Sequence, residues 1–129
     1  MQVPADLFYT KEHEWVSVKG KTATIGITDY AQSSLGDITF VDLPKAGSAT
    51  EQSKQCATVE SVKAASDVYA PVSGKVVKVN SELASHPEFI NQSPYEKGYF
   101  AVIEMTNEKE TANLMKAADY KTYVEGLSR

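Results

Sequence analysis

The side chains of this sequence that could do chemistry are few and widely spaced. His13 is followed by Glu14 but has no second histidine four residues later, and His86 stands before a proline, so neither fits a metal-binding pattern. The one cysteine, Cys56, lies in an apolar stretch and is expected to be a small buried side chain. The sequence has no glycine-rich phosphate loop, no Gly-x-Ser-x-Gly motif and no cysteine pair. It therefore predicts neither a catalytic residue nor a metal site.

Lys63 lies in the most informative stretch of the sequence. It lies in the segment 59–74, where two extended stretches meet at the small residues Ala64, Ala65 and Ser66. This pattern predicts that Lys63 lies on an exposed hairpin tip. On composition alone, Lys63 is expected to be a solvated charge like most exposed lysines. The spacing alone does not assign it a chemical role.

The elements that would position this lysine are mostly strands. Most segments with a clear hydrophobic rhythm alternate with a period of two, which is typical of β-structure. A hairpin is predicted over 16–27 with its turn at 19–21. A short helix is predicted near 29–35, between the capping side chains of Thr28 and Asp29 and the stop signal of Gly36. The remaining strands are predicted at 38–43, 56–62, 68–72, 75–79 and 99–105.

Two long segments lack the strand rhythm. Residues 80–98 are rich in Ser, Pro, Asn and charged residues and predict a long surface loop. Asn107 and Glu110 resemble a helix cap, so a C-terminal helical segment, continuous or broken, is predicted over about 107–126. Short strands with one helix in the N-terminal half and a helical tail are typical of a compact, mainly β sandwich or barrel.

Length and composition predict a single domain, 1–129. Of the 129 residues, 42% are hydrophobic and 23% are charged, so the chain can bury a core of its own. Its net charge of −4 would repel the negatively charged phosphate backbone of a nucleic acid, so we expect no nucleic acid partner. It has no apolar run of about 18 residues and no signal-peptide layout near Met1, so we expect no membrane partner and no export.

The residues around Lys63 resemble the modification site of lipoyl domains. The pentapeptide is Glu60-Ser61-Val62-Lys63-Ala64, with an acidic residue three positions before the lysine and a small residue directly after it. Biotin carriers, the nearest alternative, usually flank their lysine with methionine on both sides. Val62 and Ala64 therefore favour lipoate, joined to Lys63 as an amide, as the cofactor.

Matches to a known family extend along most of the chain. They run in order from about residue 10 to Met105: His13-Glu14-Trp15-Val16, Gly26-Ile27-Thr28-Asp29-Tyr30-Ala31-Gln32, Leu35-Gly36-Asp37-Ile38, Val41-Asp42-Leu43-Pro44, Ser73-Gly74, Val79-Asn80, Asn91 and Ser93-Pro94-Tyr95. With these motifs the sequence resembles the glycine cleavage system H proteins. Two positions depart from the family pattern: Tyr99 stands where tryptophan is common, and Ser53 stands at a turn where glycine is frequent. Both concern loops and neither touches Lys63 or its flanks.

This resemblance implies a fold and a function. The fold would be a lipoyl-domain-like β-barrel-sandwich hybrid, and the chain would be a carrier protein rather than an enzyme. In the family, the lipoyl arm carries an aminomethyl group from glycine decarboxylase, the P protein, to aminomethyltransferase, the T protein, and is reoxidised by dihydrolipoamide dehydrogenase, the L protein. A lipoate ligase or lipoyl transferase would attach the cofactor. The carrier would be a monomer in the bacterial cytoplasm, or in the mitochondrial matrix if it is a processed eukaryotic protein.

The resemblance also implies roles for residues other than Lys63. In the family the loaded arm folds back into a surface cleft, and Glu14, supported by Asp67, would accept hydrogen bonds from its amine. Ordinary solvation of both carboxylates is the alternative. Glu60 would serve recognition by the lipoylating enzyme or fix the arm of the hairpin. The full set of candidates for lipoylation recognition is Glu60, Ser61, Val62 and Ala64.

Three other functions stay open on the sequence. A partner-binding regulatory module, lipoylated or bare, would share the fold signals and could keep Lys63. A relay that passes lipoyl groups to 2-oxo acid dehydrogenase subunits would share them too. A small hydrolase would have to use Cys56 or His13, for which no base, orienting residue and oxyanion donor can be named together.

Overall fold

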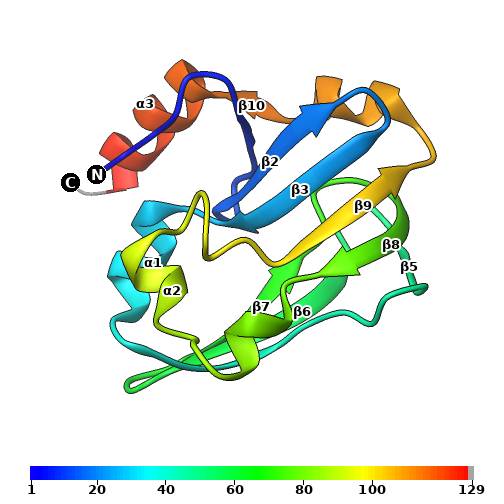
Figure 1. Ribbon diagram of the computed structural model, residues 1–129. Helices are drawn as coiled ribbons and strands as arrows, with labels where there is room; N and C mark the ends of the chain where they lie inside the picture. The colour runs from blue at the N-terminus through cyan, green and yellow to red at the C-terminus, as the bar shows by residue number, and fades with distance from the viewer. Residues whose placement is uncertain (128–129) are drawn as a thin grey trace.

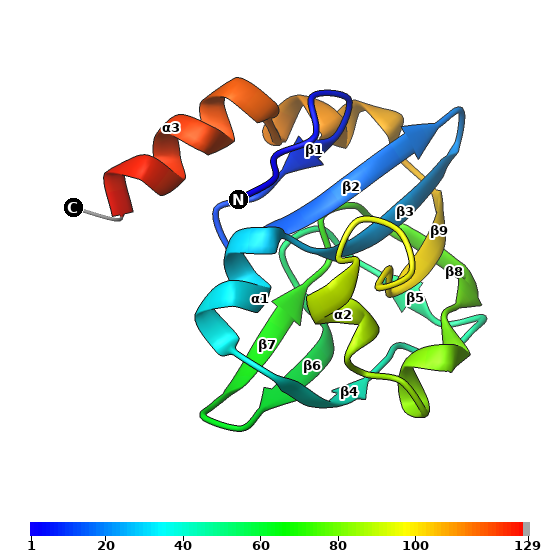
Figure 2. The ribbon, with the colours of Figure 1, turned by 60° about the vertical axis from the view of Figure 1, so that its left-hand side comes forward.

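Residues 1–127, the part of the chain described by this computed structural model, form two antiparallel sheets (Figures 1 and 2). The larger sheet has the strand order β10 (Met115–Lys116), β1 (Phe8–Tyr9), β2 (Glu14–Lys19), β3 (Thr22–Ile27), β9 (Ala101–Met105), β8 (Gly74–Val79) and β5 (Ala49–Thr50). The smaller sheet has the order β4 (Ile38–Asp42), β6 (Gln55–Ser61) and β7 (Ala65–Tyr69). The predicted hairpin over 16–27 is confirmed as the pair β2 and β3.

The first helix, α1 (Asp29–Leu35), lies where the sequence predicts it. The Thr28 hydroxyl oxygen accepts a hydrogen bond from the Ala31 amide at 3.2 Å, which caps the helix N-terminus. The helix ends at Gly36, whose φ of +79° is a conformation that glycine adopts without a Cβ clash. In Figures 1 and 2 this helix lies beside the β6–β7 hairpin.

The prediction of a long loop over 80–98 is wrong in part, because this segment contains two short helical turns. They are the 3₁₀ helix η1 (Ser81–Ala84) and the helix α2 (Phe89–Gln92). Each turn buries one apolar side chain, Leu83 in η1 and Ile90 in α2. A single buried residue per turn gives no periodicity to recognise in a polar segment.

The C-terminal segment is a broken helical tail. A 3₁₀ helix, η2 (Glu108–Asn113), is capped by the Asn107 side chain, as expected, and the helix α3 (Ala117–Leu127) follows. Between them, β10 pairs with β1 at the edge of the larger sheet. Glu110 does not complete a capping box. Its carboxylate instead accepts hydrogen bonds from the amide (2.7 Å) and hydroxyl (2.8 Å) of Ser73, which fastens the tail to the start of β8.

The predicted strand at 68–72 is wrong by three residues, because β7 already begins at Ala65. A tight turn after β6 lets the chain pair with β6 again at once. The strand ends before Pro71, which has no amide hydrogen to donate to a ladder. The next piece, predicted at 75–79, is β8, which belongs to the other sheet and pairs with β5 and β9.

Two apolar clusters hold these elements together. The larger one fills the space between the sheets with residues such as Val59, Val76 and Ile103. The smaller one consists of Tyr9, Trp15, Tyr120 and Val124, with the rings of Tyr9 and Tyr120 stacked at 4.6 Å. It fixes α3 against β1 and β2, and so places the tail beside the start of β2. Within residues 1–127, no helix is long and apolar enough to span a membrane.

Candidate functional site

Lys63 lies exposed in the turn that joins β6 to β7, as the sequence predicts. Ser61 shapes this turn: its amide donates to the Ala64 carbonyl at 2.7 Å. Its hydroxyl oxygen accepts hydrogen bonds from the amides of Lys63 (3.3 Å) and Ala64 (3.1 Å). The backbone of the tip is therefore fixed, while the lysine side chain projects from it.

The junction between α1 and β4 supports the tip from one side. The Val62 amide donates to the Asp37 carbonyl at 3.1 Å. The stem of Lys63 passes over Gly36, where an added Cβ would lie 3.2 Å from the lysine Cε. Among the residues that the structure describes, no salt bridge involves the Lys63 ammonium. Converting this amine to a neutral amide would consequently break no ion pair.

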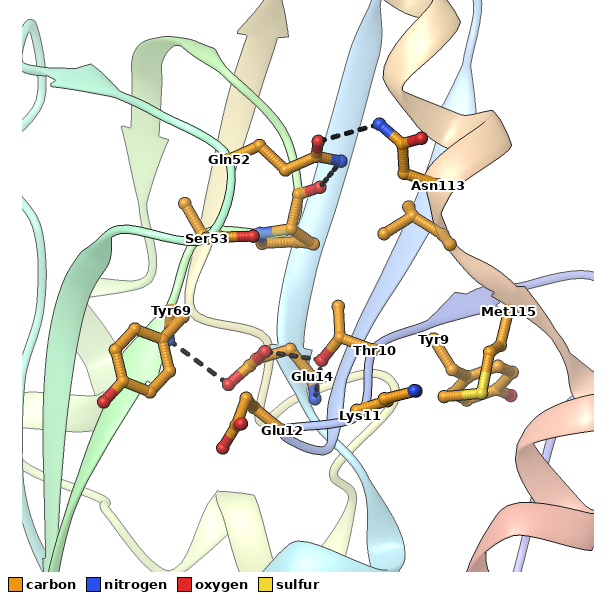
Figure 3. A pocket seen from close by; sticks show the side chains of 13 residues that line it. Tyr9, Thr10, Lys11, Glu12, Glu14, Gln52, Ser53, Tyr69, Asn113 and Met115 are labelled. Carbon is orange, nitrogen blue, oxygen red and sulfur yellow. Dashed lines mark hydrogen bonds between the residues drawn. The ribbon is translucent and has the colours of Figure 1, made fainter.

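A cleft of about 580 Å³ opens at the other end of β7 (Figure 3). Its walls come from segments far apart in the sequence: residues 9–12 with 14, 52–53, 69–71 and 113–115. The Gln52 side chain links two of these walls, because its amide group donates to the Pro71 carbonyl at 3.0 Å and its oxygen accepts from Asn113 at 3.1 Å.

Glu14 is the buried acid of this cleft, with only 2% of its surface exposed. One carboxylate oxygen, Oε1, accepts a hydrogen bond from the Thr10 hydroxyl at 2.6 Å, and the other, Oε2, accepts one from the Tyr69 amide at 3.2 Å (Figure 3). Burial raises the pKa of Glu14 to about 7, although both hydrogen bonds act to lower this pKa. Because this pKa is close to neutral pH, Glu14 can lose its proton when a basic or cationic group enters the cleft.

The structure does not bring Asp67 to the cleft. Asp67 lies on the outward face of the smaller sheet, where its Oδ1 accepts a hydrogen bond from Gln55 at 3.0 Å. Glu60 lies on the same face, opposite Phe40 of β4. The strand β7 thus connects two separate features, with the Lys63 tip at its start and the Glu14 cleft at its end.

Several residues of the cleft were missed by sequence reasoning. Thr10 stands four residues before Glu14, and a hydroxyl at that distance across a turn is a signal that could have been used. Tyr69 bonds to Glu14 through its backbone amide, so the type of its side chain gives no indication of this contact. Gln52 and the tail residues 113–115 reach the cleft through tertiary packing, which local patterns do not report.

The remaining reactive side chains are Cys56, His13 and His86, and each is engaged in packing or in a contact with another side chain. Cys56 is half-buried against the core rather than fully buried, and burial raises the pKa of its thiol to about 12, which makes it a poor nucleophile. His13 Nδ1 lies 2.9 Å from the Tyr120 hydroxyl, and burial lowers its pKa. His86 is exposed and pairs with Glu88. Among residues 1–127, no group of three His, Cys, Asp or Glu side chains could hold a metal ion.

Ser53, at the rim of the cleft, has a φ of +72°, the left-handed conformation that favours glycine. Replacing Ser53 with glycine is expected to raise the free energy of unfolding by about 1 kcal/mol, because the relief of strain exceeds the added freedom of the unfolded chain. Urea unfolding measures this change. Ser85→Gly is the matched control, since Ser85 has an ordinary φ of −95° and the same substitution should destabilise. If the Ser53→Gly protein is no more stable than the original protein, the backbone at Ser53 is not strained.

Comparisons with known proteins agree along nearly the whole chain. The family model described as "Glycine cleavage H-protein" matches residues 7–126. The "Glycine cleavage system H protein" of Staphylococcus carnosus (strain TM300) is 51% identical over 124 residues, which cover 96% of this chain and 98% of the relative. The protein of the same name from Halothermothrix orenii is 50% identical over 125 residues, covering 97% and 98%. A crystal structure of a glycine cleavage system H protein from Mycobacterium marinum superposes with a TM-score of 0.83 at 35% identity, covering 92% of this chain and 95% of that one.

The two sheets and the exposed hairpin lysine define a carrier protein with the lipoyl-domain-like β-barrel-sandwich hybrid fold, so the predicted fold class is confirmed. The chain belongs to the glycine cleavage H-protein family. It is accordingly a carrier component of the glycine cleavage system and not an enzyme, and the comparisons favour this shuttle role over a relay or a regulatory module.

Proposed function

We propose that Lys63 carries lipoate as an amide and that this arm moves an aminomethyl group from glycine decarboxylase, the P protein, to aminomethyltransferase, the T protein. Bound lipoate would supply a disulfide that opens as it accepts the group. Dihydrolipoamide dehydrogenase, the L protein, would reoxidise the dithiol that remains after the T protein has removed the group. The observation that carries the proposal is the exposed Lys63, unpaired within the described residues, on a hairpin tip whose backbone is fixed. A fixed attachment point limits the entropy lost when the arm enters a partner.

The position of the cleft suits this role. From Ala65, next to the tip, to Tyr69, next to Glu14, β7 advances four residues, or about 13 Å at about 3.3 Å per residue. A lysine lengthened by a lipoyl group has about eleven bonds from Cα to its ring, which span about 14 Å when extended. The length of β7 and the length of the arm are therefore comparable, which supports Glu14 as an acceptor for the cargo amine. Asp67 is the weaker candidate, because it lies outside the cleft.

The surroundings of the tip support direct recognition by a lipoate ligase or lipoyl transferase. Glu60, Val62 and Ala64 are all exposed, and 70% of the Val62 surface is accessible. We assign these three residues to contact with the lipoylating enzyme. Ser61 is half-buried and would act through the shape of the turn that it holds.

We further propose that residues 1–129 act as one carrier domain and that the protein is a monomer, which leaves the tip free for several partners in turn. The cited relatives from Staphylococcus carnosus and Halothermothrix orenii are bacterial, which supports a bacterial cytoplasmic location.

Intact mass tests the proposal. Protein expressed with lipoate and its ligase should gain the mass of one lipoyl group, and peptide mapping should place it on Lys63. The modified protein should then support exchange of the glycine carboxyl carbon with bicarbonate when P protein is added, and the unmodified protein should not. Modification at another lysine, or exchange that is independent of modification, would contradict the proposal.

Glu14→Gln is expected to shorten the lifetime of the loaded arm about tenfold at pH 7.5, because the loss of one charge-assisted hydrogen bond has about this effect on a rate. Formaldehyde and ammonia released from the isolated loaded protein measure the lifetime. Asp67→Asn is the matched control and should change the release less, since Asp67 does not line the cleft. Equal release rates in the original protein and the Glu14→Gln variant would remove Glu14 from the arm's path.

A further inference from the structure

Thr10 and Glu14 are joined by a reciprocal set of hydrogen bonds across the turn between β1 and β2. The Thr10 amide donates to the Glu14 carbonyl at 3.0 Å, and the Glu14 amide donates to the Thr10 hydroxyl oxygen at 3.1 Å. Because this oxygen already accepts the Glu14 amide, its own hydrogen is free to point at Glu14 Oε1, 2.6 Å away. The hydroxyl therefore acts as a donor toward the carboxylate.

The second carboxylate oxygen is held from the opposite wall of the cleft, where the Tyr69 amide donates to Oε2 at 3.2 Å. Each oxygen thus accepts one hydrogen bond and keeps capacity for another. With Glu14 almost wholly buried at the cleft wall, the remaining capacity is available to a donor that enters the cleft. Figure 3 shows the carboxylate between these two donors.

The charges around Glu14 give its ionised form little other support. Within residues 1–127, no salt bridge involves Glu14, and Glu12 in the same turn disfavours its charge. Lys11 lines the cleft but is exposed. The titratable side chains on the other packed elements are phenols and a thiol, which bring no positive charge. They are Tyr9 on β1, Cys56 on β6, Tyr69 on β7 and Tyr120 on α3.

We propose that Thr10 is a positioning residue of the cleft: its hydroxyl orients the Glu14 carboxylate and favours its charged form, so that the cleft accepts a protonated amine near neutral pH. This inference rests on the proposed function, in which the cargo carries an amine. Thr10 is thereby assigned a functional role although it lies outside the Lys63 motif.

The direction of the effect follows from the hydrogen bond. A donor to the ionised carboxylate lowers its pKa, and the Thr10 hydroxyl opposes the effect of burial in this way. Without the hydroxyl, a larger share of Glu14 would be protonated at pH 7. A protonated carboxyl group presents a donor where the amine needs an acceptor.

Titration of the unmodified, full-length protein tests the inference without the cofactor. The carboxyl carbon of Glu14 is followed by NMR from pH 4 to 9, with Glu14→Gln to assign its signal. Thr10→Val keeps the side-chain shape but lacks the hydroxyl, and its midpoint should be higher by about one pH unit. Thr10→Ser restores the hydroxyl and should titrate like the original protein. An unchanged midpoint in Thr10→Val, in a protein whose amide spectrum is otherwise native, would overturn the inference.

The loaded protein gives the second readout, the pH dependence of cargo release. In Thr10→Val, the pH at which release slows should move upward together with the Glu14 midpoint, and Thr10→Ser should restore it. If the midpoint moves but release is the same in Thr10→Val, Glu14→Gln and the original protein, the control of Glu14 by Thr10 stands and the proposed role of Glu14 toward the arm fails. The two failures are thus distinguishable.

Discussion

The Lys63→Arg protein is expected to gain no lipoyl mass and to reduce glycine exchange with P protein to the background of the unmodified chain. Arginine keeps the positive charge and most of the length of lysine, but its guanidinium does not form the lipoyl amide. Stability should be unaffected, because Lys63 is exposed and has no salt bridge among the described residues. The variant therefore separates attachment chemistry from folding.

The measurement pairs intact mass with the exchange assay on the same preparation. Lys121→Arg is the matched control, since Lys121 is an exposed lysine on α3, away from the tip. This variant should be modified and active like the original protein. A Lys63→Arg protein that still acquires the lipoyl mass, or still supports exchange, would be incompatible with Lys63 as the attachment point.

The tip could be predicted from the sequence because the contacts that close its turn are local, although the Val62 amide also bonds to the distant Asp37. Ser61 bonds to residues two and three positions later, and β6 and β7 are neighbours in both chain and sheet. The strand alternation and the small residues after Lys63 report such a hairpin directly. The same holds for α1, whose cap and stop lie within one residue of its ends.

The cleft could not be predicted in this way, because its walls are distant in sequence. Residue 14 meets residue 69 through a backbone amide. The tail is held at the cleft by the pairing of β10 with β1, by the hydrogen bonds between Glu110 and Ser73, and by the packing of Tyr120 on Tyr9. None of these contacts leaves a local pattern. The family resemblance supplied Glu14 but grouped it with Asp67, which the structure places on an outward sheet face.

The buried Glu14 also predicts a pH dependence of stability. Its pKa rises from an ordinary value of 4.5 to about 7 in the folded protein. Between these two values the folded protein holds a proton that the unfolded chain has released, so stability falls as pH rises through this window. The fall amounts to about 3 kcal/mol and is complete above pH 7. The folded protein at pH 8 thus holds a charged group at a cost to its stability.

Glu14→Gln removes this titration. The free energy of unfolding of the variant, relative to the original protein, should therefore increase by about 3 kcal/mol between pH 4.5 and pH 8. Urea unfolding at a series of pH values measures the difference, in which all other titrating groups cancel. Glu104→Gln, at an exposed carboxylate of β9, is the matched control for this substitution. A difference for Glu14→Gln that does not change with pH would mean that Glu14 ionises as easily as in water. The cleft would then hold no destabilised charge for an amine to neutralise, and the binding of cargo would gain nothing from the burial of Glu14.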